Sequence, residues 1–375
     1  MMATTRRDCL DRESPYAHLD VVLIGAVAAV AVLGLVMVFS TTRGTGAEPN
    51  TYFVVRQSVF TVGGVGALVA AMSVDYRRLR DWAVPFYGLA MALLVAVVTP
   101  LGQERKGTQA WFELFSLQFQ PSEAAKVVLI LAMAAFLSVE EGALGGTRLL
   151  GAMVVIGVPS ALIMLQPDLG TVLVFIVLGM GLATVAGADP RHLALIGLVG
   201  LVTTLGVLTS DVLQEYQRDR LTSFIGDSGD LQGAQYNVRQ SQIAVGSGGI
   251  SGQGLFDGPQ TQNGFVPEQQ TDFIFTAVGE ELGFIGAAAL LGLFGLIALR
   301  IFRAAQLAAD RFGALICIGV LIVLVFQIFQ NVGMTMGIMP ITGIPLPFMS
   351  YGGSSTVTEF AAIGLVLNVH MRRFA

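Results

Sequence analysis

Long apolar runs separated by shorter polar stretches fill most of the chain. A helix needs about 20 apolar residues to cross the hydrocarbon core of a bilayer. Ten runs approach that length, so we expect ten transmembrane helices. The runs at 148–166 and 169–187 are also compatible with one re-entrant pair around Pro167. The ten runs cover residues 19–40, 55–74, 82–100, 121–138, 148–166, 169–187, 192–210, 272–301, 312–331 and 353–370.

The composition supports an integral membrane protein. The chain has 375 residues, of which 54% are hydrophobic and 13% are charged, whereas soluble domains carry about 25% charged residues. Two cysteines, Cys9 and Cys317, provide neither a disulfide framework nor metal-ligand spacing. The three histidines are scattered, so a histidine-ligated metal is not expected. No cleavable signal peptide is apparent, because the first apolar run begins only at Leu19 and is long enough to span.

The basic residues predict the orientation, because Lys and Arg are retained on the cytoplasmic side. With the N-terminus inside, the inner segments hold thirteen basic residues and the outer loops six. We therefore expect an all-α polytopic membrane protein with both termini in the cytoplasm. Residues 1–18 form the cytoplasmic N-terminal segment, 19–370 a single ten-helix membrane domain, and 371–375 the cytoplasmic C-terminus. Arg56 and Lys126 fall at or inside spans and need a separate explanation.

Three outer connections carry further signals. Residues 211–271 form a long extracytoplasmic loop between spans 7 and 8, and its glycine-rich run at 245–258 predicts a mobile flap. Residues 101–121 contain several aromatics that suit the membrane interface. Residues 332–355 are apolar, uncharged and broken by prolines. Irregular backbone at membrane depth is tolerated only against protein or a cavity, so we expect this segment to pack against protein.

Span 8 begins with three carboxylates, Asp272, Glu280 and Glu281. A carboxylate at membrane depth costs about 2.5 kcal/mol or more, so it is usually shielded and kept for function. Thr271 can cap this helix, which would put Asp272 in the first turn, where N–H groups favour an anion. Asp272 is thus the first candidate for a working residue, with a plain capping role as the alternative. Glu280 and Glu281 lie two turns deeper, and we expect them to bind other helices.

Other unusual polar residues gather on the same predicted outer side. Glu123 and Lys126 are three residues apart in span 4, so they share a helical face. They can serve a site or form an ion pair that only fixes the span. Arg56 can face a site or extend along the interface to water. Asp168 can face a site or cap span 6, and Glu359 in span 10 has no obvious partner.

Five ordered motifs resemble the SEDS family of shape, elongation, division and sporulation proteins. The resemblance covers nearly the whole chain, and the segment at 331–348 is closer to the elongation branch than to the division branch. The motifs are QPSEAAK at 120–126, QPDLGT at 166–171, PEQQTDFIF at 267–275, GEELG at 279–283 and PITGIPLPFMSYGGSS at 340–355.

The resemblance implies a peptidoglycan glycosyltransferase that polymerises lipid II during cell elongation and cell-shape maintenance. The implied location is the bacterial cytoplasmic (inner) membrane, with the active site on the extracytoplasmic side. The implied partners are lipid II, the nascent glycan strand, a class B penicillin-binding transpeptidase and other elongation-complex membrane proteins. No nucleic acid is implied.

The family's essential aspartate lands on Asp272, the expected catalytic residue. The resemblance also implies a set of substrate-binding residues. The sequence departs from the family pattern at Gln270, Ala110 and Glu359. No dedicated metal motif is present, so Mg²⁺ or Mn²⁺ is left open as a cofactor. The implied substrate-binding residues are Arg56, Lys126, Glu123, Asp168, Gln120 and Ser350.

The implied chemistry is inverting attack of a GlcNAc 4-hydroxyl on a polyprenyl-diphosphate-linked disaccharide. Asp272 can remove the hydroxyl proton. Arg56 and Lys126 can stabilise the departing diphosphate, with helpers from the loops at Arg105, Lys106, Arg218 and Arg220. Two alternatives stay open: a lipid II flippase, because intramembrane charges also suit a transport pathway, and a non-catalytic scaffold of the wall-synthesis complex.

Overall fold

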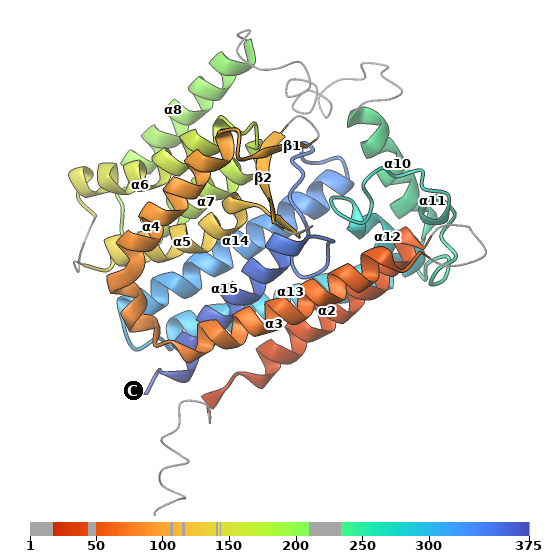
Figure 1. The fold of residues 1–375 in the computed structure, drawn as a ribbon, viewed down its shortest axis with the longest axis horizontal. Helices are drawn as coiled ribbons and strands as arrows, with labels where there is room; N and C mark the ends of the chain where they lie inside the picture. The colour runs from red at the N-terminus through yellow and green to blue at the C-terminus, as the bar shows by residue number, and fades with distance from the viewer. Residues whose placement is uncertain are drawn as a thin grey trace, which may run out of the picture.

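The computed structural model describes residues 18–43, 50–105, 108–114, 117–139, 142, 144–209 and 234–374. Figure 1 shows a bundle of long helices that run in roughly one direction, with short elements gathered at one end. Each predicted apolar run corresponds to a helix or, in one case, to a pair of helices. These are α2 (Val21–Thr42), α3 (Tyr52–Ser73), α4 (Tyr76–Val98), α5 (Pro121–Leu137), α6 (Gly146–Met164), α7 (Leu169–Val185), α8 (Pro190–Thr209), α12 (Ile274–Glu281) with α13 (Gly283–Gln306), α14 (Arg311–Thr335) and α15 (Gly353–Met371).

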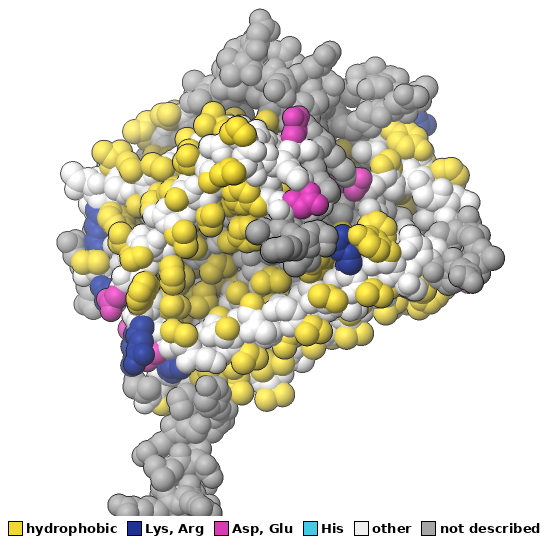
Figure 2. All heavy atoms as spheres, in the orientation of Figure 1, with side chains coloured by type: hydrophobic (Ala, Val, Ile, Leu, Met, Phe, Trp, Pro, Cys, Tyr) yellow, Lys and Arg dark blue, Asp and Glu magenta, His cyan; other side chains and the backbone are white. Residues whose placement is uncertain are grey.

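The outer surface of the bundle suits lipid. Six helices among the described residues are long and apolar enough to cross a membrane, and α7 is a shorter apolar helix. On α3 the exposed large side chains recur every three or four residues, which places them on one helical face. Figure 2 shows hydrophobic side chains spread across this side of the molecule. Ten crossings stay a prediction. The exposed α3 residues are Val55, Val59, Val62, Val65 and Val69.

Both ends of the described chain lie at one end of the bundle. The rings of His18 and Phe374 meet edge to face with centroids 5.1 Å apart. At this end Arg300 pairs with the buried Asp20 at 2.7 Å, and Figure 2 shows basic side chains gathered where α4 begins. The shared end agrees with the predicted orientation, in which this end would be cytoplasmic.

Small residues let α3 and α15 pack against each other closely. A Cβ added at Gly64 of α3 would lie 2.8 Å from the Phe360 ring, and one at Gly364 of α15 would lie 2.5 Å from the Leu68 carbonyl oxygen. Helices that associate in lipid use such small residues to bring their backbones together. This contact fixes the start of α15 beside the start of α3.

The predicted span at 272–301 is two helices. The break falls at Leu282 and Gly283, because the φ of +65° at Gly283, the first residue of α13, does not continue α12. Asp272 lies before α12, so the expectation that Thr271 caps the helix and that Asp272 occupies its first turn is wrong: the N-cap is Phe273, without a side-chain cap bond. An apolar run predicts membrane depth but does not reveal where its backbone leaves the helix.

The glycine-rich run is packed, so the predicted flap at 245–258 is wrong. Its first residues end α10 (Ala234–Ser247), and the short α11 (Pro259–Gln262) follows, so part of the predicted loop is helical. Residues 210–233 of that loop lie outside the described residues. The backbone of the run forms hydrogen bonds with the break between α12 and α13. Phe284 N–H donates to the Gly249 carbonyl at 2.9 Å, and Gln253 N–H donates to the Glu280 backbone carbonyl at 2.9 Å.

The two deeper carboxylates bind neighbouring elements, as the sequence predicts. Glu280 accepts bonds from the backbone N–H groups of Gln260 at 2.7 Å and Thr261 at 2.9 Å, at the start of α11. Glu281 accepts a bond from the hydroxyl of Ser40 on α2. Both glutamates are fully buried, so their role is to hold α11 and α2 against α12.

Gly252→Ala should destabilise the protein by about 1–3 kcal/mol through backbone strain alone. Gly252 has a φ of +84°, and an added Cβ would lie 2.1 Å from the Glu281 carbonyl oxygen. Gly246→Ala is the matched control, because Gly246 lies in α10 with open space around it and alanine favours a helix. Thermal unfolding in detergent checks this: equal melting temperatures for the two variants would contradict the packed arrangement.

A small antiparallel sheet, which the sequence did not predict, accompanies the helices at residues 103–119. Strands β1 (Gln103–Arg105), β2 (Thr108–Leu114) and β3 (Leu117–Phe119) pair in the order β1-β2-β3. Phe112 of β2 lies opposite Phe119 of β3. The sheet lies at the same end of the bundle as α10–α12 (Figure 1).

Candidate active site

A cavity of about 410 Å³ opens at the end of the bundle that carries the sheet. Residues at or near the starts of α3, α5, α7 and α15 line it, together with the turn before α12. Helix N-termini present unpaired N–H groups and the positive ends of their dipoles. Several such ends at one cavity favour an anionic ligand.

Lys126 and Glu123 form an ion pair in the wall of this cavity. The Nζ–Oε2 distance is 2.8 Å, and each residue is only 5% exposed. Both side chains project from the first turns of α5, whose N-cap is Gln120. The structure therefore confirms the ion pair. It also places both residues at the cavity, so the pairing and a binding role are compatible.

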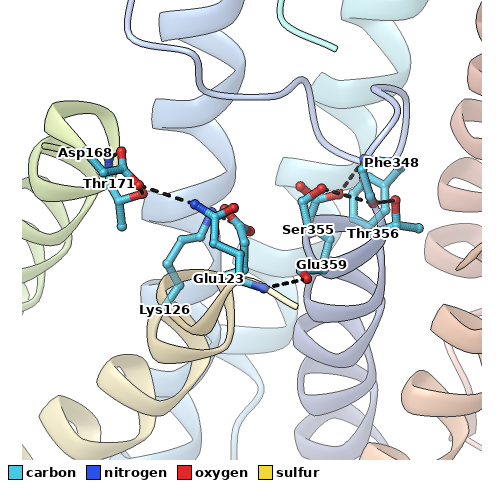
Figure 3. A network of polar contacts seen from close by, with 11 residues as sticks. Glu123, Lys126, Asp168, Thr171, Phe348, Ser355, Thr356 and Glu359 are labelled. Atoms are coloured by element: carbon cyan, nitrogen blue, oxygen red, sulfur yellow. Dashed lines mark hydrogen bonds and ion pairs between the residues drawn. The ribbon is translucent and has the colours of Figure 1, made fainter. Parts of the chain in front are cut away.

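Asp168 is the N-cap of α7, as one of the two sequence interpretations predicts. Its Oδ1 accepts a bond from Thr171 N–H at 3.0 Å and its Oδ2 one from the Thr171 hydroxyl at 2.8 Å. Gln120 Nε2 donates to the same Oδ2 at 3.4 Å, so α5 and α7 are linked at the cavity. Figure 3 shows Glu123 and Lys126, in this view, between the α7 residues and Glu359 on α15.

Arg56 lies on the opposite side of the cavity, one turn into α3. Its Nη1 donates to the Tyr52 hydroxyl at 2.6 Å, and its guanidinium lies 5.7 Å from the centre of the Phe60 ring. The planar guanidinium suits both aromatic contact and bidentate binding of phosphate oxygens. Aromatic residues thus hold the side chain at the cavity.

Asp272 lines the same cavity and is half-buried. Its N–H donates to the Glu268 carbonyl at 3.1 Å. Gly343 lies opposite, with a φ of +70°, and a Cβ there would lie 3.4 Å from Asp272 Oδ2. The glycine therefore leaves room beside the carboxylate. The cavity is lined by six of the predicted site residues: Asp272, Arg56, Lys126, Glu123, Asp168 and Gln120.

The proline-rich segment forms another wall and is bonded to the turn before α12. Asn331 of α14 donates through Nδ2 to the carbonyls of Asp272 and Ile344, both at 2.8 Å. Ser350 donates to the Thr271 carbonyl and accepts from Leu346 N–H at 2.9 Å. These bonds confirm that the apolar, proline-broken segment packs against protein.

Ser350 departs from its predicted role. It is buried and absent from the cavity lining. Both interactions of its hydroxyl are with backbone groups, which leaves it holding the segment in place rather than facing a substrate. Its place inside a glycine-rich and serine-rich motif gave no means of separating these two roles.

Glu359, which lacked a partner in the sequence, caps a strained turn. Its Oε2 accepts a bond from Phe348 N–H at 2.7 Å, and Phe348 has a φ of +62°. Its other oxygen is buried without a hydrogen-bond partner. A pocket of about 30 Å³ separates Glu359 from Glu123 and Lys126, which is room for a water molecule.

Two further residues at this cavity escaped sequence reasoning. Trp111, expected at the membrane interface, lines the cavity from β2. Tyr351 lines it beside α3, with its ring centroid 5.2 Å from that of Phe53. Burial raises the pKa of the Tyr351 phenol, so the hydroxyl stays protonated and can donate a bond. In the sequence only the aromatic character of these two residues was visible.

The described residues do not provide a site for a divalent ion. No group of three Cys, His, Asp or Glu side chains gathers among them, and the Glu123 carboxylate is paired with Lys126. A cage made by the protein alone does not fit this part of the chain, so we assign no step to a divalent ion. The loop cations Lys106, Arg218 and Arg220 lie outside the described residues.

Known proteins resemble this chain over nearly all of its length. A family model described as a cell cycle protein, FtsW/RodA/SpoVE, matches residues 20–374. A probable peptidoglycan glycosyltransferase FtsW of Geobacter metallireducens is 35% identical over 360 residues, 94% of this chain and 95% of that one. The peptidoglycan glycosyltransferase MrdB of Escherichia coli K12 is 36% identical over 312 residues, 83% of each chain.

Solved structures show the same fold. A chain from a peptidoglycan synthase complex, described by the coordination of polymerization and crosslinking, superposes with a TM-score of 0.80 at 34% identity. It covers 95% of this chain and 98% of that one. The rod shape determining protein RodA of Thermus thermophilus superposes with a TM-score of 0.71 at 31% identity, over 95% and 98% of the two chains. The fold is therefore that of a polytopic membrane protein.

Proposed function

Because the chain belongs to the FtsW/RodA/SpoVE family of cell cycle proteins and is a multi-pass membrane peptidoglycan glycosyltransferase, we propose that its cavity polymerises lipid II with Asp272 as the catalytic base. The observation that carries this proposal is that Asp272, Lys126 and Arg56 line the same cavity. Sugar transfer from a diphosphate uses a base for the incoming hydroxyl and positive charge for the departing phosphates, and these three residues can supply both.

The carboxylate acts on the acceptor. Asp272 accepts the proton of the GlcNAc 4-hydroxyl as the oxygen attacks the anomeric carbon of the donor, and the configuration there inverts. General base catalysis of this kind typically contributes 10²–10⁴-fold. The half-buried position of Asp272 keeps it reachable from the cavity.

The cations act on the donor. The bond to the diphosphate breaks as the new glycosidic bond forms, and negative charge develops on the leaving phosphate oxygens. Lys126 and Arg56, with the N-terminal ends of the surrounding helices, stabilise that charge. A diphosphate leaves readily, so no second carboxylate is needed as a general acid, in contrast with glycosidases. Glu123 orients Lys126 through their ion pair.

The cavity opens on the extracytoplasmic side in this proposal. It lies at the end of the bundle away from the paired His18 and Phe374, and the excess of basic residues at that opposite end favours a cytoplasmic location for the termini. Lipid-linked precursors displayed on the outer leaflet would reach the cavity directly.

The partner that we propose is a class B penicillin-binding transpeptidase. The structural relative with the TM-score of 0.80 belongs to a complex described by polymerization and crosslinking, and crosslinking is a transpeptidase reaction. The relatives carry the names of both division and elongation proteins. The elongation role rests on the segment at 331–348, and the other elongation-complex proteins are proposed on the same basis.

Purified protein incubated with lipid II tests the function. We expect glycan strands resolved by gel electrophoresis, and none when lipid II is omitted. Reconstituted vesicles that move labelled lipid II between leaflets without forming strands would instead favour a flippase. The cavity at one end of the bundle speaks against that alternative, because transporters bind substrate near the bilayer midplane.

A further inference from the structure

The backbone that carries Asp272 is held by an unusual set of bonds. Three consecutive carbonyl groups are each bonded to a different group outside the turn. Gln270 accepts from Tyr351 N–H at 2.8 Å, Thr271 accepts from the Ser350 hydroxyl, and Asp272 accepts from Asn331 Nδ2 at 2.8 Å. In a continuous helix these carbonyls would serve the N–H groups four residues later.

The bond to Asn331 replaces a helical bond. Thr276 N–H donates to the Phe273 carbonyl at 2.9 Å, three residues back, whereas a regular α-helix would send it to Asp272. The Asp272 carbonyl therefore bonds the α14 side chain, and α12 begins only at Ile274. The turn keeps Asp272 outside the helix, at the cavity.

Asn331 also fixes a second wall of the cavity. The second hydrogen of its Nδ2 bonds the Ile344 carbonyl at 2.8 Å, and Ile344 lines the cavity. One fully buried amide thus joins the two walls between which the carboxylate lies. Its own Oδ1 is buried without a hydrogen-bond partner, a cost that an apolar residue would avoid. The contribution of the amide is therefore the two hydrogen bonds that its Nδ2 donates.

We propose that Asn331 is a positioning residue that, together with Ser350, holds the Asp272 carboxylate at the distance from the cavity wall that proton transfer requires. This inference rests on the proposed function of Asp272. A shift of about 1 Å in a reacting group can lower a rate by about 100-fold. Loss of the amide should therefore lower kcat and leave substrate binding in place, because Asn331 does not line the cavity.

The test compares Asn331→Leu with Gln330→Met in lipid II polymerisation by the purified full-length protein. Gln330 is the neighbouring residue on α14, equally buried, and its Nε2 donates to the Pro340 carbonyl at 2.9 Å without touching the Asp272 turn. Both variants lose a buried bond to the same proline-rich segment. We expect kcat to fall about 100-fold in Asn331→Leu, with KM for lipid II within about threefold, and nearly wild-type kinetics in Gln330→Met.

A second measurement does not depend on activity. Hydrogen–deuterium exchange of the amides at 271–276 should accelerate in Asn331→Leu and stay unchanged in Gln330→Met. Ser350→Ala, a smaller change in packing, should act like Asn331→Leu and covers the case in which that variant fails to fold. Matching kcat losses in the Asn331 and Gln330 variants, or unchanged exchange at 271–276, would overturn the positioning role. Absence of polymerisation by the wild-type protein would instead count against the proposed function.

Discussion

Asp272→Asn should lower the rate of lipid II polymerisation by about 10²–10⁴-fold and leave a folded protein in the membrane. Asparagine has nearly the same shape as aspartate but cannot take up the hydroxyl proton, so the loss should match the 10²–10⁴-fold that a general base contributes. The Asn331 bond to the backbone carbonyl at this position does not depend on the side chain and should persist. Strand synthesis by purified protein and membrane insertion are the two measurements.

Asp257→Asn is the matched control for that substitution. Asp257 lies in the segment between α10 and α11, is exposed and does not line the cavity. It should keep wild-type activity, which would show that loss of one carboxylate at this end of the bundle is not harmful in itself. Normal strand synthesis by the Asp272 variant would remove that residue from the mechanism.

Lys126→Met should lower kcat/KM for lipid II by about 10²–10³-fold, the effect of removing one group that stabilises charge in a transition state. It should also lower the melting temperature, because Glu123 would be left buried without its partner at 2.8 Å. Steady-state kinetics and thermal unfolding separate these two effects.

The double variant Glu123→Gln/Lys126→Met separates binding from packing. Removing both charges should restore much of the stability, while activity should stay low because the diphosphate has lost a cation. Lys126→Arg keeps the charge and should retain part of the activity. If Lys126→Met lowers only the melting temperature, the pair serves to fix α5 and has no part in the reaction.

The positions of the long helices could be predicted from the sequence because the bilayer sets their length. Apolar runs of about 20 residues leave few alternatives to a membrane-spanning helix. The exposed valines on α3 suit a surface in contact with lipid. The residues at the starts of α5 and α7 were also recognisable. Glu123, Lys126 and Asp168 are charged groups in otherwise apolar surroundings, and such groups are costly unless they serve a site.

Contacts made by the backbone could not be predicted, because they leave no pattern in side-chain polarity. The run around Gly252 resembles a flexible linker, yet its main chain bonds the break between α12 and α13. Asn331 was equally hidden, since it is one of three amides near the end of a long apolar helix and nothing in the sequence separates it from Gln327 and Gln330. Its contact with Asp272 joins residues 59 positions apart.

A structure of the protein bound to a lipid-diphosphate-linked disaccharide and an acceptor sugar would test the role of Asp272 most directly. We expect the diphosphate near Lys126 and the acceptor 4-hydroxyl about 2.6–3.2 Å from the Asp272 carboxylate, the range for proton transfer. An acceptor bound outside the cavity, or a carboxylate that faces away from both sugars, would contradict it.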